Sequence, residues 1–587
     1  MKGPRRRAST LALALSIAAM GAQAPIAIAA PAAAATPTAT AASPTGFFVK
    51  TNPSPPGDPL PHPYALLVPR SYTAAHAWPL LVALHGAFST HTENLQRVLG
   101  GINPQSPSLD PPMLVVSPLG GGELLAYDGL GEDDVLGVLA AVRRDYNIDP
   151  DRIYLTGLSM GGGGTWSMGL RHPDLFAALV PVCAVVDPRQ WIADADRRLY
   201  DLPALELGMP PAIAENALNQ RVFIYHGDAD PVVPVADARR MVERFRALGW
   251  LNKSVRYFEL PGVTHSAWDV AYRNQNIFRL LDGIRRDPFP ARVWFKTGSL
   301  RYQRAYWTRV DRIDRVGLSS GLAEIDARHS DGVFIVRVAN ISGFSLLLPP
   351  NAVAATKPIT VRVQDGTTAG AASSDSDKDK DKDSASAGAV VFSGAAGAGS
   401  FFFSRDSGRW RRVDAPVSGA PPAHATVGLA SRSLPRQGPH VYVYGTDGPA
   451  ATAQAARHLA EALADWGPGV RARFAVVADR ELSDDAIARQ HLVLVGDATI
   501  NRVTRRLAAR APLPIVADAA RGDRAYRLVV QDAFTPGKHA LIFGAQSPAA
   551  LNRLNRFARP NKDAWAPEPN LDYIQFDAAG SVEKTRY

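Results

Sequence analysis

Short apolar runs alternate with helical segments between residues 61 and 290, and this alternation restricts the possible folds more than any other feature of the chain. Runs typical of buried strands lie at 64–68, 79–84, 113–117, 153–156, 179–186, 222–225 and 255–260. Helical periodicity lies between them, at 133–146, 160–172, 235–248 and 267–285. Parallel neighbouring strands need a crossover, usually a helix, so the pattern predicts a mainly parallel sheet with helices on both faces.

The chain is long for one compact core, and its pattern changes after this region. Residues 291–435 read as an antiparallel β module, and residues 436–570 read as a small α/β accessory domain followed by a tail at 571–587. The run SSDSDKDKDKDSASAG falls in an insert at 366–390, which we expect to be disordered. It lacks the glycine and the final acidic residue of a calcium-binding loop. The accessory domain has no phosphate-binding glycine motif, so no nucleotide is expected there.

The first 30 residues have the layout of a signal peptide. A basic start precedes an apolar stretch from Leu11 to Met20 and Ala-x-Ala sites. An N-terminal anchor helix is the alternative, but the apolar stretch is short for a membrane span. An Ala/Pro/Thr-rich tether is expected at 31–60. We therefore expect a secreted or periplasmic protein without stable membrane insertion after signal cleavage.

The net charge does not indicate a nucleic-acid partner. Loss of the four basic residues in the signal lowers the formal charge from +9 to +5, and the remaining basic residues are scattered. Nucleic-acid binding proteins concentrate such residues on one face. Cys183 is the only cysteine, so no internal disulfide can form, and its apolar surroundings favour a buried packing role.

The stretch LTGLSMGGGG at 155–164 follows a predicted strand and opens a predicted helix. A strand, then Gly157-x-Ser159-x-Gly161, then a helix is the context of a nucleophile elbow. The tight turn leaves no room for flanking side chains and exposes the serine hydroxyl at the carboxyl edge of the sheet. Ser159 is therefore the candidate nucleophile.

A serine hydroxyl is a weak nucleophile and needs a base that a carboxylate orients. Asp228 and Asp230 follow the predicted strand at 222–225, and His265 follows the strand at 255–260. The order Ser, Asp, His is the one that an α/β-hydrolase sheet produces. Alternatives remain for each residue: Asp230 as a helix cap, His265 as an ordinary loop residue, and His226 with both aspartates as a metal site.

Five segments together resemble secreted α/β-hydrolases of the polyhydroxybutyrate depolymerase and feruloyl esterase group, and predicted bacterial peptidases of the prolyl oligopeptidase clan. The segments are LLVALHG, DRIYLTGLSMGGGGTW, RHPDLFAALVPVC, FIYHGDADPVVP and GVTHSAWD. The resemblance covers about residues 60 to 290. It implies that Asp230 is the carboxylate of the H-G-x-x-D-x-x-V-P motif, that His265 is the base, and that Asp228 is a turn residue.

Acyl transfer also requires hydrogen-bond donors for the developing oxyanion. The backbone N–H of Met160 is one candidate, and the loop after LLVALHG should supply the other, for which we choose Ala87. His85 in the same loop is interpreted as structural. This chemistry needs no metal and no organic cofactor.

The sequence thus predicts a serine hydrolase acting on small-molecule or polymer-linked carboxylic esters. A serine peptidase resembling prolyl oligopeptidase, acting on peptides, is the first alternative. A propeller that would restrict entry to short peptides is not expected, because the β module has one insert instead of repeated blades. The alternative from another class is a binding protein that keeps the hydrolase fold without activity.

Overall fold

The computed structural model describes residues within the unit Ala42–Tyr587. The described residues are 44–586 without 53–61, 124–125, 201, 315–320, 351–357, 367–387, 396–398, 418–439, 467–473, 511–522, 531–532, 536–537, 559–570 and 572. The expected signal peptide at 1–30 and most of the expected disordered insert lie outside them. No helix in the described part of the chain is long and apolar enough to cross a membrane.

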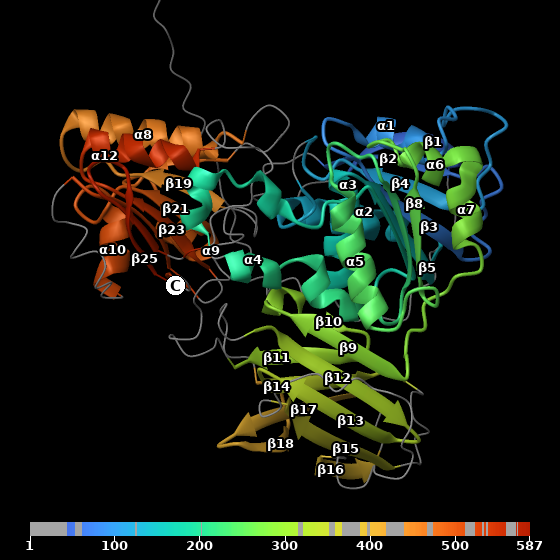
Figure 1. The fold of residues 1–587 in the computed structure, drawn as a ribbon. Helices are drawn as coiled ribbons and strands as arrows, with labels where there is room; N and C mark the ends of the chain where they lie inside the picture. Colours follow the sequence, from blue (N-terminus) through green and yellow to red (C-terminus); the bar gives the residue numbers. More distant parts are fainter. Residues whose placement is uncertain are drawn as a thin grey trace, which may run out of the picture. The chain divides into compact units, whose positions relative to one another are not determined.

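The N-terminal sheet has eight strands in the order β1-β2-β4-β3-β5-β6-β7-β8 (Figure 1). β1 pairs antiparallel with β2, β2 pairs antiparallel with β4, and the pairs from β4 to β8 are parallel. The strands are β1 (Gly46–Asn52), β2 (His62–Val68), β3 (Trp78–Leu84), β4 (Leu114–Pro118), β5 (Ile148–Leu158), β6 (Ala178–Val182), β7 (Arg221–Gly227) and β8 (Val255–Leu260). The predicted mainly parallel sheet is confirmed.

Successive side chains of a strand point to opposite faces of the sheet, so each face has its own apolar core. Helices cover both faces. In β3, Leu80, Val82 and Leu84 join one core, whereas Leu81 and Ala83 join the other. Helices α2, α3 and α5 pack on the first face, and α1, α6 and α7 pack on the second. Their bounds are α1 (His91–Val98), α2 (Leu130–Asp145), α3 (Met160–Arg171), α5 (Val235–Ala247), α6 (Trp268–Ala271) and α7 (Asn276–Leu281).

Two expectations for this region need correction. Residues 46–52, expected in the tether, form β1, because their whole length pairs with β2 in one continuous register. The single helix expected at 267–285 is broken into α6, a 3₁₀ turn at Arg273–Gln275, and α7. Asn274 and Gln275 have φ angles of 51° and 56°, and such left-handed residues end a right-handed helix.

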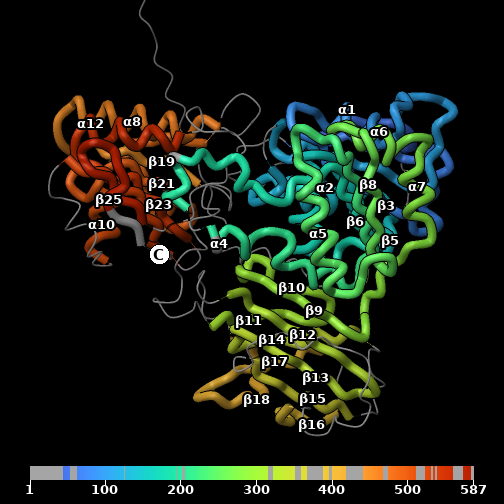
Figure 2. Tube along the Cα trace, viewed as in Figure 1, coloured from blue at the N-terminus to red at the C-terminus, as the bar shows by residue number. Residues whose placement is uncertain are grey.

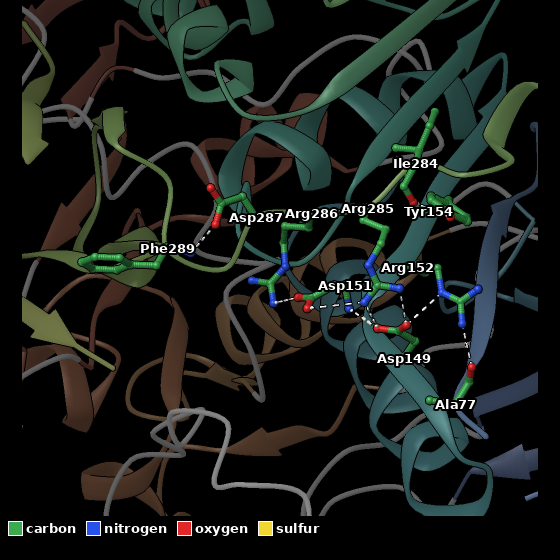
Figure 3. A network of polar contacts seen from close by, with 10 residues as sticks. All are labelled: Ala77, Asp149, Asp151, Arg152, Tyr154, Ile284, Arg285, Arg286, Asp287 and Phe289. Carbon is green, nitrogen blue, oxygen red and sulfur yellow. Dashed lines mark hydrogen bonds and ion pairs between the residues drawn. The ribbon is translucent and has the colours of Figure 1, made fainter. Parts of the chain in front are cut away.

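A polar network fastens the segment after α7 to the start of β5 (Figure 3). Arg285 Nη1 donates to Asp149 Oδ2 at 2.8 Å, and Arg286 Nη2 donates to Asp151 Oδ1 at 2.7 Å. Arg152 donates to the same Asp149 carboxylate at 2.8 Å. β5 is therefore held at its amino end to the segment after the last helix, while its carboxyl end leads into the LTGLSMGGGG turn.

The β module consists of two five-stranded sheets, β10-β11-β14-β17-β18 and β16-β15-β13-β12-β9, whose path can be followed in Figure 2. Both sheets contribute to one apolar core. The pairs are antiparallel as expected, except that β13 and β15 are parallel. The strands are β9 (Arg292–Thr297), β10 (Arg304–Ala305), β11 (Thr308–Ile313), β12 (Ala323–Ser330), β13 (Val333–Ala339), β14 (Ile341–Leu348), β15 (Pro358–Asp365), β16 (Ala389–Ala395), β17 (Gly399–Asp406) and β18 (Arg409–Val413).

The C-terminal region is a seven-stranded sheet in the order β20-β19-β21-β23-β22-β24-β25. Helices α8 and α12 pack on one face, and α9 and α10 pack on the other. The expected tail at 571–587 contains the last two strands, because the apolar run at 573–576 pairs with β22. The elements are β19 (His440–Tyr444), α8 (Ala450–Ala464), β20 (Val476–Ala478), α9 (Asp484–Arg489), β21 (His491–Val495), α10 (Arg502–Arg510), β22 (Ala525–Val530), β23 (Ala540–Gly544), α12 (Pro548–Arg553), β24 (Tyr573–Phe576) and β25 (Val582–Arg586).

Candidate active site

Ser159 occupies the turn between the end of β5 and the start of α3. Its φ and ψ angles are 56° and −116°, a conformation that residues with a side chain rarely adopt. Its N–H donates to the carbonyl oxygen of Val182 at 2.9 Å, which ties the turn to the neighbouring strand β6. Such strain persists only where the surrounding structure enforces it, and it is typical of functional sites.

The glycines around Ser159 make this turn sterically possible. A Cβ atom on Gly157 would lie 2.2 Å from the carbonyl oxygen of Gly161. A Cβ atom on Gly161 would lie 2.3 Å from the carbonyl oxygen of Leu84 and 2.6 Å from that of His85. Both contacts are with backbone, which cannot move away at low cost. The first turn of α3 is therefore packed directly on the end of β3.

This packing predicts different effects on stability for alanine substitutions at two glycines of α3, Gly161 and Gly163. Gly161→Ala should destabilise the protein by about 1–3 kcal/mol because the new methyl group overpacks the β3 backbone. Gly163→Ala should be nearly neutral, because its Cβ atom would meet Val185 at 3.2 Å and the helical propensity of alanine offsets the crowding. Urea denaturation of the two variants measures the difference. Equal stability of both variants would contradict the close packing.

His265 and Asp230 extend from Ser159 as a continuous chain of contacts. His265 Nε2 lies 2.9 Å from Ser159 Oγ, and His265 Nδ1 lies 2.7 Å from Asp230 Oδ2. Asp230 follows β7 and His265 follows β8, so adjacent parallel strands deliver both side chains to one edge. A Cβ atom on Gly227 would lie 2.5 Å from the carbonyl oxygen of Thr264, which shows how closely the two loops approach. The three predicted residues are brought together.

Asp230 is held in its charged form. Burial alone would raise the pKa of its carboxyl group, but hydrogen bonds outweigh this effect and hold the pKa well below its usual range. The donors are His226, His265 and the N–H groups of Val232 and Val233. A permanently charged carboxylate beside Nδ1 favours the tautomer in which Nε2 can accept the serine proton.

Asp228 is placed differently from Asp230. It is exposed, and its Oδ1 accepts a hydrogen bond of 2.7 Å from the N–H of Gly262. It thus closes a turn against the segment after β8, in agreement with the expected turn role.

The two expected oxyanion donors are Met160, at the start of α3, and Ala87, in the segment after β3. Met160 is the first residue of α3, where backbone N–H groups have no acceptor within the helix. Ala87 follows β3, and the adjacent N–H of Phe88 already donates to the carbonyl oxygen of Glu123 at 3.1 Å. Within the described residues, the backbone hydrogen bonds leave the N–H of Ala87 without an acceptor. This pattern supports the choice of Ala87 over Phe88.

His85 stabilises the loop that carries Ala87. It is fully buried, its Nδ1 lies 2.8 Å from the carbonyl oxygen of Gly86, and its Nε2 lies 2.8 Å from that of Leu119. Burial lowers its pKa, which favours the neutral ring. The hydroxyl group of Tyr127 donates to the carbonyl oxygen of His85 at 3.2 Å. These contacts agree with the structural interpretation of His85.

Cys183 is a neighbour of the site that sequence reasoning treated only as packing. Its sulfur atom, a carboxylate oxygen of Asp230 and a nitrogen of His265 lie within 4.8 Å of one another. Among the described residues, Cys183, Asp230 and His265 form the group whose residue types and spacing could hold a metal ion. His226 does not belong to this group. Burial raises the pKa of the Cys183 thiol far above its ordinary value, so the thiol is neutral and a poor metal ligand at neutral pH.

The sheet order, the elbow and the Ser–His–Asp contacts define the class of α/β-hydrolase folds. Residues 130–282 match the model of the prolyl oligopeptidase family. A stretch of 66 residues, 11% of this chain, is 41% identical to Esterase LipC of Mycobacterium tuberculosis and covers 13% of that protein. A stretch of 126 residues, 20% of this chain, is 28% identical to poly(3-hydroxyalkanoate) depolymerase C of Paucimonas lemoignei and covers 30% of it.

Among solved structures, a thermostable esterase is 27% identical, with a TM-score of 0.31, over 41% of this chain and 64% of its own. The chain spans less than a third of the length of either curated relative. The family match and the relatives support a serine hydrolase of esterase or peptidase type.

Proposed function

We propose that this protein is an exported serine hydrolase that cleaves carboxylic esters through an acyl-enzyme intermediate. The observation that carries the proposal is the chain of contacts from Ser159 Oγ to His265 Nε2 at 2.9 Å and from His265 Nδ1 to Asp230 Oδ2 at 2.7 Å. A nucleophile, a base and an orienting carboxylate in this order are the constellation of acyl transfer.

The reaction proceeds in two displacements. In the first, Ser159 Oγ attacks the ester carbonyl carbon while His265 Nε2 takes the serine proton, and the N–H groups of Met160 and Ala87 stabilise the oxyanion. The tetrahedral intermediate collapses as His265 gives the proton to the departing alkoxide, which leaves as the alcohol. In the second, water loses a proton to His265 and attacks the acyl-enzyme, which releases the carboxylic acid and restores Ser159.

Three features favour esters over peptides. Phe88 and Val232 are 71% and 53% exposed. Phe88 follows Ala87 directly and Val232 is two residues after Asp230, which suits an apolar substrate near the site. The curated relatives are an esterase and a polyester depolymerase by name. The described strands of the β module form two five-stranded sheets instead of the repeated four-stranded blades of a propeller.

Peptide hydrolysis is the second candidate, because residues 130–282 match the prolyl oligopeptidase family. Specificity constants for acetyl, butyryl and feruloyl esters and for an aminoacyl-prolyl amide distinguish the two. We expect at least one ester to be cleaved more efficiently than the amide, because an alkoxide leaves with less help than an amine. Faster cleavage of the amide than of every ester would replace the esterase proposal with the peptidase.

Export is part of the same proposal and is supported by the basic and apolar start of the sequence. Expression of the full chain in a bacterial host should yield a shortened protein outside the cytoplasm. Retention of the intact N-terminus in the cytoplasm would contradict export without affecting the hydrolase proposal.

A further inference from the structure

We infer that His226 is a positioning residue that orients the Asp230 carboxylate toward His265. The inference rests on the proposed function, because it assigns a role within the same site. His226 is in β7, one residue before the strand ends at Gly227, and its side chain is fully buried.

The contacts of His226 determine its tautomer. Its Nε2 atom lies 2.9 Å from the carbonyl oxygen of Val233 and 3.4 Å from Asp230 Oδ2. A carbonyl oxygen can only accept a hydrogen bond, so Nε2 carries the proton. The N–H group at Nε2 therefore donates to the carbonyl oxygen of Val233. The carboxylate of Asp230 lies near the same N–H group, at a longer distance.

Val233 completes a closed ring of contacts with these two side chains. Its N–H donates to Asp230 Oδ1 at 3.0 Å, while its carbonyl oxygen accepts from His226. His226 thus acts on Asp230 twice: directly at Oδ2, and through Val233, whose N–H donates to Oδ1. Because Oδ2 also accepts from His265 at 2.7 Å, this ring determines how the carboxylate faces the base.

The other ring nitrogen shows that His226 is not simply filling space. Its Nδ1 atom is buried and has no hydrogen-bond partner among the described residues. A buried acceptor without a donor costs free energy, whereas methionine would fill similar space without that cost. The presence of a polar ring here is therefore explained by its Nε2 contacts with Val233 and Asp230.

Three substitutions of His226 test this role. His226→Met removes the donor, and His226→Asn keeps an amide that is too short to reach, because its nitrogen corresponds to Nδ1. His226→Gln places an amide nitrogen at about the position of Nε2. We expect kcat with a short-chain ester to fall about 10–100-fold in the methionine and asparagine variants, with KM nearly unchanged, and to recover in the glutamine variant.

The control is His491→Met, which removes a buried histidine from β21 of the C-terminal sheet and should leave kcat unchanged. Thermal melting of each variant separates lost positioning from lost folding. If the methionine variant does not fold, the comparison of asparagine with glutamine decides.

Wild-type kcat in a folded methionine or asparagine variant, or a glutamine variant as slow as the other two, would overturn the inference. A wild-type protein that neither hydrolyses esters nor reacts with a fluorophosphonate would instead overturn the proposed function, and the inference with it.

Discussion

Replacement of Ser159 by alanine is expected to abolish labelling by a fluorophosphonate probe and to lower kcat by about a million-fold. The probe reacts with a serine hydroxyl that a base activates. Ser159 Oγ lies 2.9 Å from the proposed base atom, His265 Nε2. Because Ser159 belongs to neither hydrophobic core of the sheet, the melting temperature should change little. In-gel fluorescence and ester turnover measure the two effects.

The matched control for this variant is Ser167→Ala. Ser167 lies on the same helix, α3, and its hydroxyl group donates to the carbonyl oxygens of Tyr127 and Gly164 at 3.2 Å. It should keep full labelling. Equal labelling of Ser159→Ala and the wild type would rule out Ser159 as the nucleophile.

The second large effect is expected for Asp230→Asn, which should lower kcat about 10⁴-fold. An amide in place of the carboxylate can present its NH₂ group to His265 Nδ1, which stabilises the tautomer that cannot accept the serine proton. The loss should come from kcat, because Asp230 acts through the ring of His265, which its Oδ2 atom contacts. Steady-state kinetics with one short-chain ester measures it.

Asp228→Asn is the internal comparison for that experiment. Asp228 is exposed and accepts a hydrogen bond from the N–H of Gly262, which an asparagine oxygen can also accept. The expected loss is therefore within about tenfold. A severe loss for Asp228→Asn together with a mild loss for Asp230→Asn would exchange the two roles.

Local sequence patterns were sufficient to predict those elements whose conformation depends mainly on neighbouring residues. The apolar runs that became β3, β5 and β7 are buried on both faces, and such strands need no partner to be recognised. The turn at Ser159 follows from Gly157 and Gly161, since only residues without side chains fit there. The choice between Asp228 and Asp230 came from the resemblance, and the observed burial of Asp230 agrees with it.

Other elements depended on partners distant in the sequence. Residues 46–52 form β1 by pairing with β2, and 573–576 form β24 by pairing with β22. Hydrophobic periodicity likewise does not indicate that β13 pairs parallel with β15, or that the helical segment breaks near Asn274. These outcomes depend on tertiary contacts, whose free energy exceeds local propensity.

The alternation of apolar runs and helical segments over residues 61–290 was enough to predict the class of fold. The glycines around Ser159 were enough to predict the elbow, and the resemblance supplied the roles of Asp230 and His265. Three contacts became apparent only in the folded protein: His226 contacts Asp230, Cys183 lies beside the same carboxylate, and the N–H of Phe88 donates to the carbonyl oxygen of Glu123. The contact of His226 with Asp230 depends on how the chain turns after β7. The other two contacts join segments that follow different strands, and the separation of those segments depends on how the sheet packs and twists, which no local pattern encodes.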